Sequence, residues 1–118
     1  MTVQELVAAL SGWQLPIVRE EFVLQQNLEQ VLIQEIGSEH FQREYSLSDR
    51  ERIDFMCFGS IGIEVKTQGS MSSVAAQLLR YAECEEVKGL ILVTTRRRHL
   101  FPKSELAGKP FGSILLGL

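Results

Sequence analysis

The spacing of hydrophobic residues predicts two helices in the first third of the chain. Residues 3–10 (VQELVAAL) have a helical period and predict a short helix. Gly and Pro interrupt the pattern within residues 11–16 (SGWQLP). Over residues 17–36 the period returns and predicts a long amphipathic helix that ends at Gly37. The positions expected on its buried face are Val18, Phe22, Gln25, Leu28, Val31, Leu32 and Ile36.

Alternation of hydrophobic and polar residues replaces the helical period from residue 40 onward. It predicts three short strands in succession, over residues 40–46, 52–58 and 61–67. Gly59 and Ser60 separate the second strand from the third, so we expect these two strands to form a β-hairpin.

The last part of the chain contains both kinds of pattern. Residues 71–86 have a helical period, and residues 89–95 (GLILVTT) form the continuous apolar run that is typical of a strand covered on both faces. A last strand is expected within residues 111–118 (FGSILLGL). This order of elements predicts an α/β fold in which helices flank a mixed β-sheet, built as a single domain over residues 1–118.

Composition agrees with one globular domain and restricts its partners. The sequence is 45% hydrophobic and 23% charged, which is close to the average of globular proteins. Its 118 residues are enough for one hydrophobic core and too few for two. The formal net charge of -3 argues against a protein that coats nucleic acid by charge alone, but it is compatible with local basic clusters. Because the chain shows neither a long apolar run nor a secretory leader pattern, we expect a cytoplasmic protein without a membrane segment.

Cysteine and histidine residues show no spacing that is typical of a reactive site. Cys57 and Cys84 lack the C-x-x-C arrangement of zinc or redox sites, so we expect two reduced and largely buried thiols. His40 and His99 have no partners at the spacing of a zinc site or a catalytic triad.

The predicted hairpin carries charged residues among its hydrophobic ones. Side chains alternate between the faces of a strand, so pairing must bring the hydrophobic positions of both strands to the same face. The two sets to be matched are Ile53, Phe55 and Cys57 on one strand and Val65, Ile63 and Ile61 on the other. The same register sets Asp54 directly opposite Glu64, with Lys66 two residues further along the same face.

Two carboxylates that face each other repel unless positive charge lies between them. Lys66 supplies part of this charge, and converging carboxylate oxygens are also the ligands that Mg²⁺ or Mn²⁺ prefers. The alternative is an ordinary salt-bridge cluster on a solvated sheet face. The predicted helices need a sheet face to pack against, so we expect the charged face to be partly covered, where unpaired charge is costly.

These residues resemble the signature of the PD-(D/E)xK nuclease superfamily, in which an acidic pair binds Mg²⁺ and a lysine helps to activate water. Asp54, followed after a hairpin by residues 64–66 (EVK), matches the signature. Residues 77–81 (QLLRY) are similar to the Q-x-x-x-Y motif of RecB-like and lambda-exonuclease-like members. The order of elements over residues 17–95 resembles the restriction-endonuclease-like core, α-βββ-α-β, and the chain looks like a small phage- or prophage-type nuclease domain.

The resemblance implies a role for each residue of the hairpin motif. Asp54 and Glu64 would bind the metal ion, with the Val65 carbonyl as a further oxygen ligand. Lys66 would lie beside the attacking water and the scissile phosphate, where its charge favours hydroxide and offsets the charge that develops in the transition state.

An early helix often contributes another acid in such nucleases, and Glu21 is the expected one here. Gln25 lies one turn further along the same helix, and Glu29 is a second choice. A glutamate on an amphipathic helix is also typical of its solvated face.

Two groups of residues are candidates for contact with nucleic acid. Gln77 and Tyr81 lie one helical turn apart, so they share a face that could hold a DNA phosphate or strand, with Arg80 beside them. The alternative is a tyrosine that packs on the core. The second group follows a buried strand and would either contact phosphates or be solvated; it consists of Arg96, Arg97 and Arg98.

These features together predict a Mg²⁺- or Mn²⁺-dependent deoxyribonuclease that acts in recombination, repair or phage replication. The alternative is a module on the same fold that binds nucleic acid or supports assembly without catalysis. Because 118 residues leave little surface beyond the core, we also expect a homo-oligomer, a dimer or larger.

Overall fold

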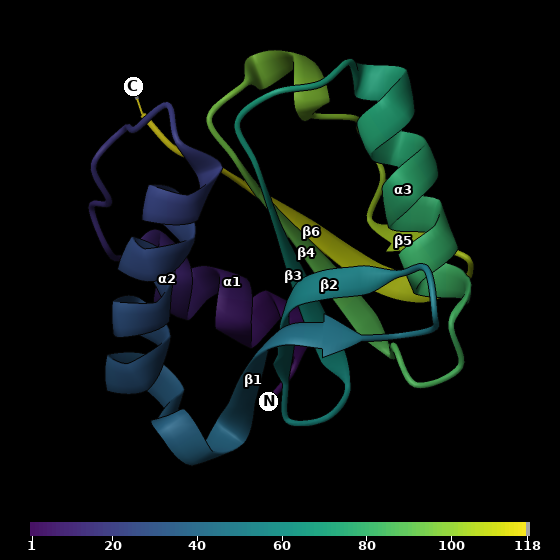
Figure 1. The fold of residues 1–118 in the computed structure, drawn as a ribbon, viewed down its shortest axis with the longest axis horizontal. Helices are drawn as coiled ribbons and strands as arrows, with labels where there is room; N and C mark the ends of the chain where they lie inside the picture. The colour runs from purple at the N-terminus through teal and green to yellow at the C-terminus, as the bar shows by residue number, and fades with distance from the viewer. Residues whose placement is uncertain (118) are drawn as a thin grey trace.

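A mixed sheet of six strands runs through the molecule, as the computed structural model shows for residues 1–117 (Figure 1). The strands are β1 (Phe41–Ser46), β2 (Arg52–Cys57), β3 (Ile61–Lys66), β4 (Gly89–Thr94), β5 (Glu105–Leu106) and β6 (Lys109–Leu115). Their spatial order is β1-β2-β3-β4-β6-β5. β3, β4 and β6 are parallel, β2 is antiparallel to both β1 and β3, and β5 is antiparallel to β6. The predicted α/β class and mixed sheet are confirmed.

Helices lie on both faces of this sheet. α1 (Val3–Ser11) and α2 (Glu21–Ile36) cover one face, and α3 (Met71–Glu83) covers the other (Figure 1). Two 3-10 helices, η1 (Ser38–His40) and η2 (Arg97–His99), follow α2 and β4. Within residues 1–117, no helix is both long and apolar enough to cross a membrane.

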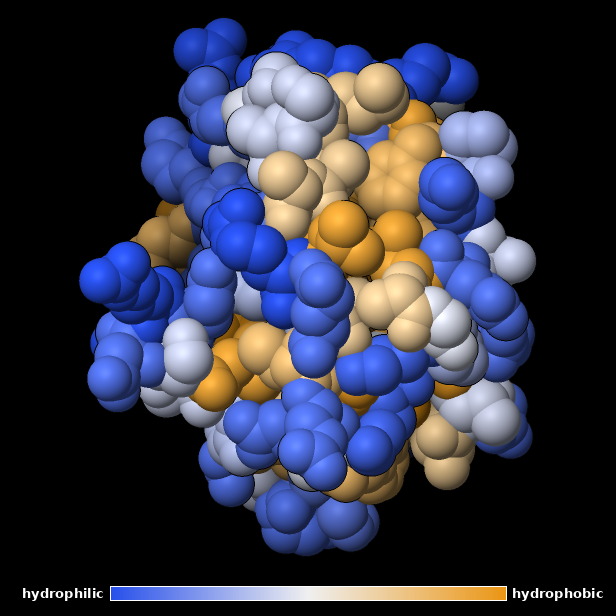
Figure 2. All heavy atoms as spheres, turned by 90° about the vertical axis from the view of Figure 1, so that its right-hand side faces the viewer, coloured by the Kyte–Doolittle hydropathy of each residue, from blue (hydrophilic) through white to orange (hydrophobic). Residues whose placement is uncertain are grey.

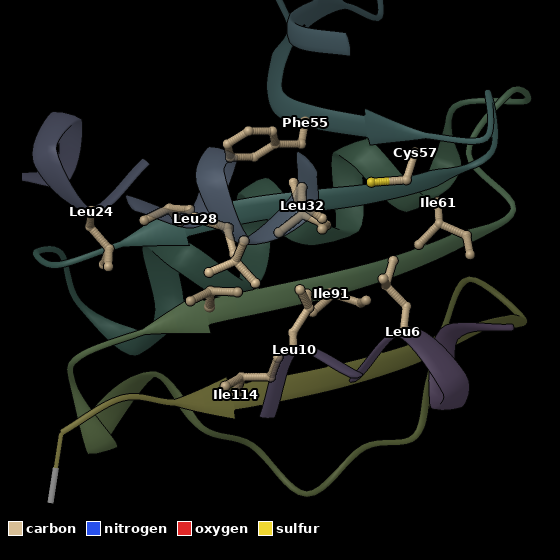
Figure 3. Packing of buried hydrophobic residues seen from close by; sticks show 14 of the residues in the cluster. Leu6, Leu10, Leu24, Leu28, Leu32, Phe55, Cys57, Ile61, Ile91 and Ile114 are labelled. Atoms are coloured by element: carbon tan, nitrogen blue, oxygen red, sulfur yellow. The ribbon is translucent and has the colours of Figure 1, made fainter. Parts of the chain in front are cut away.

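Hydrophobic side chains form one cluster on each face of the sheet. The larger cluster joins α1 and α2 to the sheet (Figure 3), and its labelled members are Leu6, Leu10, Leu24, Leu28, Leu32, Phe55, Cys57, Ile61, Ile91 and Ile114. The smaller cluster lies under α3 and consists of Ile53, Val74, Leu78, Tyr81, Ala82, Leu90, Leu92 and Phe111. β4 therefore contributes to both clusters with alternate residues, which explains its continuous apolar run.

The long helix is shorter than the sequence predicts. α2 begins at Glu21 instead of residue 17, after Glu20 in an extended conformation. Ile17 and Phe22 are both 63% exposed, so the expected place of Phe22 on the buried face is wrong. Burial of an apolar face is the main source of helix stability in proteins, and between residues 17 and 20 only Val18 packs against the larger cluster. Leu24 is the first fully buried residue of the helix.

The C-terminal part also differs in detail from the prediction. α3 ends at Glu83 instead of residue 86, because Cys84 has an extended backbone. β5 is not predicted by the sequence, since two residues are too few to show an alternating pattern. β6 begins two residues earlier than expected, and Leu118 of the predicted strand lies outside the described residues.

Both cysteines are free. Cys57 is fully buried, and burial raises the pKa of its thiol to about 12. Cys84 is only half-buried, so the expectation of buried thiols is met in full by Cys57 alone.

Candidate active site

At the end of the β2–β3 hairpin away from the turn, side-chain carboxylates accept hydrogen bonds from the backbone amides of the facing strand. Phe55 pairs with Ile63 as predicted, and this is the last backbone pair between the two strands. One step further, the Asp54 amide donates to Glu64 Oε1 at 3.2 Å, and the Val65 amide donates to Asp54 Oδ2 at 2.7 Å. The two carboxylates therefore lie opposite each other, as the register predicts, and each accepts a hydrogen bond from the facing strand.

Beside the acidic pair, side chains of β1 and β2 that alternation assigns to one face of the sheet lie on opposite faces. Alternation predicts that Ile53 shares a face with Phe55, but Ile53 packs in the smaller cluster under α3, so this prediction is wrong. In β1, Arg43 reaches α2 whereas Tyr45 packs toward the α3 cluster. Glu44, between them, has a φ of 53°, which is unusual for a residue other than glycine. β1 and β2 thus change face beside the acidic pair, and simple alternation fails there.

Burial makes the acidic pair electrostatically demanding. Glu64 is only 4% exposed, and Asp54 is half-buried. Loss of solvent raises the pKa of Glu64, and the charge of Asp54 raises it further. Burial likewise raises the pKa of Asp54. Lys66 opposes both shifts, with Nζ 3.4 Å from Glu64 Oε2. The pair therefore favours a bound proton or cation.

Glu21 approaches the same site from the first turn of α2. Its Oε1 accepts a hydrogen bond of 2.8 Å from the Thr67 amide, just after Lys66. The charge of Glu21 contributes to the raised pKa of Asp54, after burial. Glu21 therefore faces the site without joining the pair as a third ligand. Throughout residues 1–117, no three His, Cys, Asp or Glu side chains are grouped closely enough to hold a metal ion.

The other two polar candidates on α2 point elsewhere. Arg43 donates through Nη2 to Gln25 at 3.0 Å and through Nη1 to Glu29 at 3.3 Å. Its guanidinium also lies 5.6 Å from the centre of the Phe55 ring. Gln25 and Glu29 therefore bind β1 to α2.

The predicted pair on α3 lies behind Glu64. Tyr81 is 1% exposed, and its hydroxyl donates to the Arg52 carbonyl at 2.9 Å and lies 3.5 Å from Glu64 Oε2. Gln77 donates through Nε2 to the same hydroxyl at 2.8 Å. Burial raises the pKa of Tyr81, and Glu64 raises it further, so the phenol stays protonated. Hydrogen bonds thus run from Gln77 to the Tyr81 hydroxyl and on to the Arg52 carbonyl, and the hydroxyl lies beside Glu64, so the structure places Tyr81 against an acid of the site and not on the open surface.

The predicted basic residues fall into two groups. Arg80 is exposed and donates to Glu51 Oε1 at 2.7 Å, away from the acidic pair. The other three lie at the end of β4 and in η2, which is where the sequence expects an exposed basic run: Arg96, Arg97 and Arg98. Arg96 donates through Nε to the Thr67 carbonyl at 2.8 Å, and Arg98 to the Gly69 carbonyl at 3.0 Å.

Sequence reasoning missed three polar residues near the site. Thr67 follows β3 and Thr94 ends β4, two strands that the sequence identifies by their apolar residues, and each threonine is at most 2% exposed. His99 is fully buried, although it closes an exposed basic run. The apolar residues after His99 are the one signal that could have indicated its burial.

Comparison of the chain with protein-family models, with curated proteins and with solved structures gives no significant match.

Proposed function

We propose that the protein is a metal-dependent nuclease of the PD-(D/E)xK type that hydrolyses DNA phosphodiester bonds. The observation that carries the proposal is the acidic pair at the end of the hairpin. Asp54 and Glu64 are drawn together from facing strands, with Lys66 3.4 Å from one of them. The element order from α2 to β4 resembles that of the restriction-endonuclease-like core, and this resemblance supports the same proposal.

The donor set fits a divalent cation with hard oxygen ligands. Each carboxylate accepts an amide through one oxygen, which leaves Asp54 Oδ1 and Glu64 Oε2 as the expected ligands. The Val65 carbonyl is the proposed further ligand, and its amide already orients Asp54. A bound Mg²⁺ or Mn²⁺ would polarise the phosphate and lower the pKa of water.

The remaining residues act on the pair or on the substrate. With a cation between the carboxylates, Lys66 would be released from Glu64 to face the phosphate, where a positive charge stabilises the transition state. Tyr81 and Gln77 orient Glu64 from behind, and Glu21 fixes the start of the β3–α3 loop (residues 67–70) through the Thr67 amide. We propose these as positioning roles.

The distribution of charge supports a polyanionic substrate at this edge. Residues 17–22, 66–70 and 95–99 are joined by hydrogen bonds, and together with Asp54 and Glu64 they contain five basic and four acidic residues. The rest of the chain contains seven basic and eleven acidic residues. A phosphate backbone is therefore attracted to this edge and repelled elsewhere.

A panel of single-stranded, blunt, flapped and branched DNA, each with Mg²⁺, Mn²⁺ or EDTA, tests the proposal. We expect metal-dependent cleavage of at least one structure and saturable Mn²⁺ binding, both lost in Glu64→Gln. Wild-type protein that neither binds Mn²⁺ nor cuts any substrate would refute the proposal that the protein is a nuclease.

A non-catalytic nucleic-acid-binding module is the second candidate. The absence of a third acid from the pair, within residues 1–117, favours this alternative. Salt-dependent DNA binding that needs neither metal nor Asp54 would support it.

We also propose that the chain self-associates through the outer side of α3. Figure 2 shows hydrophobic side chains gathered there, and the exposed or half-buried ones are Met71, Ala75, Leu79, Phe101 and Leu106. Lys103 and Glu105 lie beside them, so a two-fold contact could match each charge with its opposite. In sedimentation, Leu79→Glu should give monomers, whereas Phe22→Glu on α2 should behave like wild type.

A further inference from the structure

The buried His99 bridges the end of β4 to the β3–α3 loop. Its Nε2 lies 2.8 Å from the Gly69 carbonyl, and its Nδ1 lies 2.6 Å from Thr94 Oγ1. Because a carbonyl can only accept, Nε2 carries the proton, and Nδ1 accepts from the Thr94 hydroxyl. Thr94 Oγ1 in turn accepts the Arg96 amide at 3.0 Å. Each of these polar atoms therefore has a partner of the correct kind.

Two arginines attach the same loop from the outside. Arg96 holds the Thr67 carbonyl, and Arg98 holds the Gly69 carbonyl that His99 also contacts. Charged donors make stronger hydrogen bonds than neutral ones. The loop is therefore held on its inner side by an imidazole and on its outer side by guanidinium groups.

This loop connects the residues of the proposed site. It directly follows Lys66, whose carbonyl accepts the Thr95 amide at 3.3 Å. Its first amide binds Glu21, and its last residue, Ser70, caps the start of α3. A shift of the loop would thus move Lys66 and the helix that carries Tyr81 together.

We infer that His99 is a positioning residue, which clamps the β3–α3 loop so that Lys66 is aimed at the acidic pair. The inference rests on the proposed function for its catalytic consequence, but the clamp itself is a property of the loop. His99 does not touch the carboxylates, so metal binding should not depend on it.

Matched variants separate a hydrogen-bonding clamp from simple filling of the core. His99→Gln can still accept from Thr94 and donate to Gly69, whereas His99→Leu fills the space without either bond. Thr94→Ser and Thr94→Val form a second pair that tests the same network, in case His99→Leu does not fold.

Three measurements on these variants decide the inference. We expect amide exchange of Thr67 and Thr95 to accelerate at least tenfold in His99→Leu and Thr94→Val, while core amides such as Ile91 are unchanged. The kcat for DNA cleavage should fall by about 10²-fold, as expected for a displaced catalytic group, with KM and Mn²⁺ affinity within twofold of wild type. His99→Gln and Thr94→Ser should restore both properties.

Two outcomes would overturn the clamp. One is equal behaviour of the Gln and Leu variants, and the other is an unchanged exchange rate at Thr67 in every folded variant. If wild-type protein cuts no DNA, the proposed function fails, but the exchange measurement still decides whether His99 holds the loop.

Discussion

The two ends of the β2–β3 hairpin share one register but are held together by different chemistry. Near the turn, Phe55 and Cys57 pair with Ile63 and Ile61 through the backbone, and all four side chains pack in the larger cluster. At the other end, carboxylates accept the amides that a ladder would otherwise use. The first end, which we call the paired end, gains stability from apolar burial. The second, the acidic end, places like charges in a buried setting, which costs stability.

This contrast indicates that the paired end serves folding, whereas the acidic end serves the binding of a proton or cation. A fold needs the paired end, whereas the acidic end is favourable only when a proton or cation is present. Substitutions at the two ends should therefore separate stability from activity.

Loss of one carboxylate should have the largest effect on activity, without any loss of stability. In Asp54→Asn and Glu64→Gln an amide oxygen can still accept the facing backbone amide, but a charged ligand is lost. We expect cleavage to fall by at least about 10³-fold, which corresponds to about 4 kcal/mol of transition-state stabilisation. The midpoint of urea unfolding without metal should stay the same or rise, since a like-charge repulsion is removed. A variant with reduced stability and normal turnover would contradict the contrast.

Truncation at the paired end should do the reverse. Phe55 is fully buried, so Phe55→Ala should lower the free energy of unfolding by about 3–5 kcal/mol. Cleavage per folded molecule, corrected by the unfolded fraction, should change little. Phe58→Ala, beside the turn and 39% exposed, is the matched control and should cost far less.

The paired end is also the part that sequence predicted best. The alternation of apolar residues determines the register of β2 against β3, because a slip by one residue would move every hydrophobic side chain of the strand to the other face. Phe55 opposite Ile63 follows from this rule, and so does the nearness of Asp54 to Glu64.

The rest of the site depends on contacts between residues far apart in the chain. The change of face at Ile53 follows from the geometry of three strands, and no local pattern encodes it. The same holds for Glu21 binding Thr67 and for His99 binding Gly69. Tyr81 was found from a motif, but its burial against Glu64 could be seen only once α3 was placed over the sheet.

The pH dependence of stability gives an intermediate effect at the acidic end. Folding raises the pKa of both Asp54 and Glu64, mainly through burial, so the native state binds protons more tightly than the unfolded chain. Their contribution is complete below the usual carboxyl pKa of about 4 and is lost as the pH rises through the raised native values. Unfolding of metal-free protein should therefore occur at lower urea at pH 8 than at pH 5.

Glu64→Gln should reduce this loss, and so should Mn²⁺ at pH 8 if the proposed site binds it. A metal-free stability that rises between pH 5 and pH 8 would show that the acids are not destabilised by burial.

Removal of the Tyr81 hydroxyl should have a smaller effect, on both stability and activity. Tyr81→Phe keeps the ring in the α3 cluster but loses the bond to the Arg52 carbonyl, at a cost of about 1 kcal/mol in the free energy of unfolding. Because Glu64 also loses a neighbour, we expect a modest fall in kcat with KM unchanged. Tyr45→Phe, which removes a hydroxyl that donates to Glu86 instead of contacting Glu64, is the matched control, and equal kinetics in both variants would remove Tyr81 from the site.

The smallest effect should come from Arg97, which lies between two arginines that hold the β3–α3 loop. Both Arg96 and Arg98 donate through Nε to loop carbonyls, so their removal would change the loop as well as the charge. Arg97 is exposed, and its replacement should report on charge alone. If it contacts one phosphate, Arg97→Ala should reduce the slope of log affinity against log salt by about 0.7 to 0.9, with unfolding unchanged. Arg50→Ala, in the turn between β1 and β2, should leave the slope unchanged. An equal slope for all three proteins would mark Arg97 as solvated surface and would confine substrate binding to the acidic end and the arginines that clamp the loop.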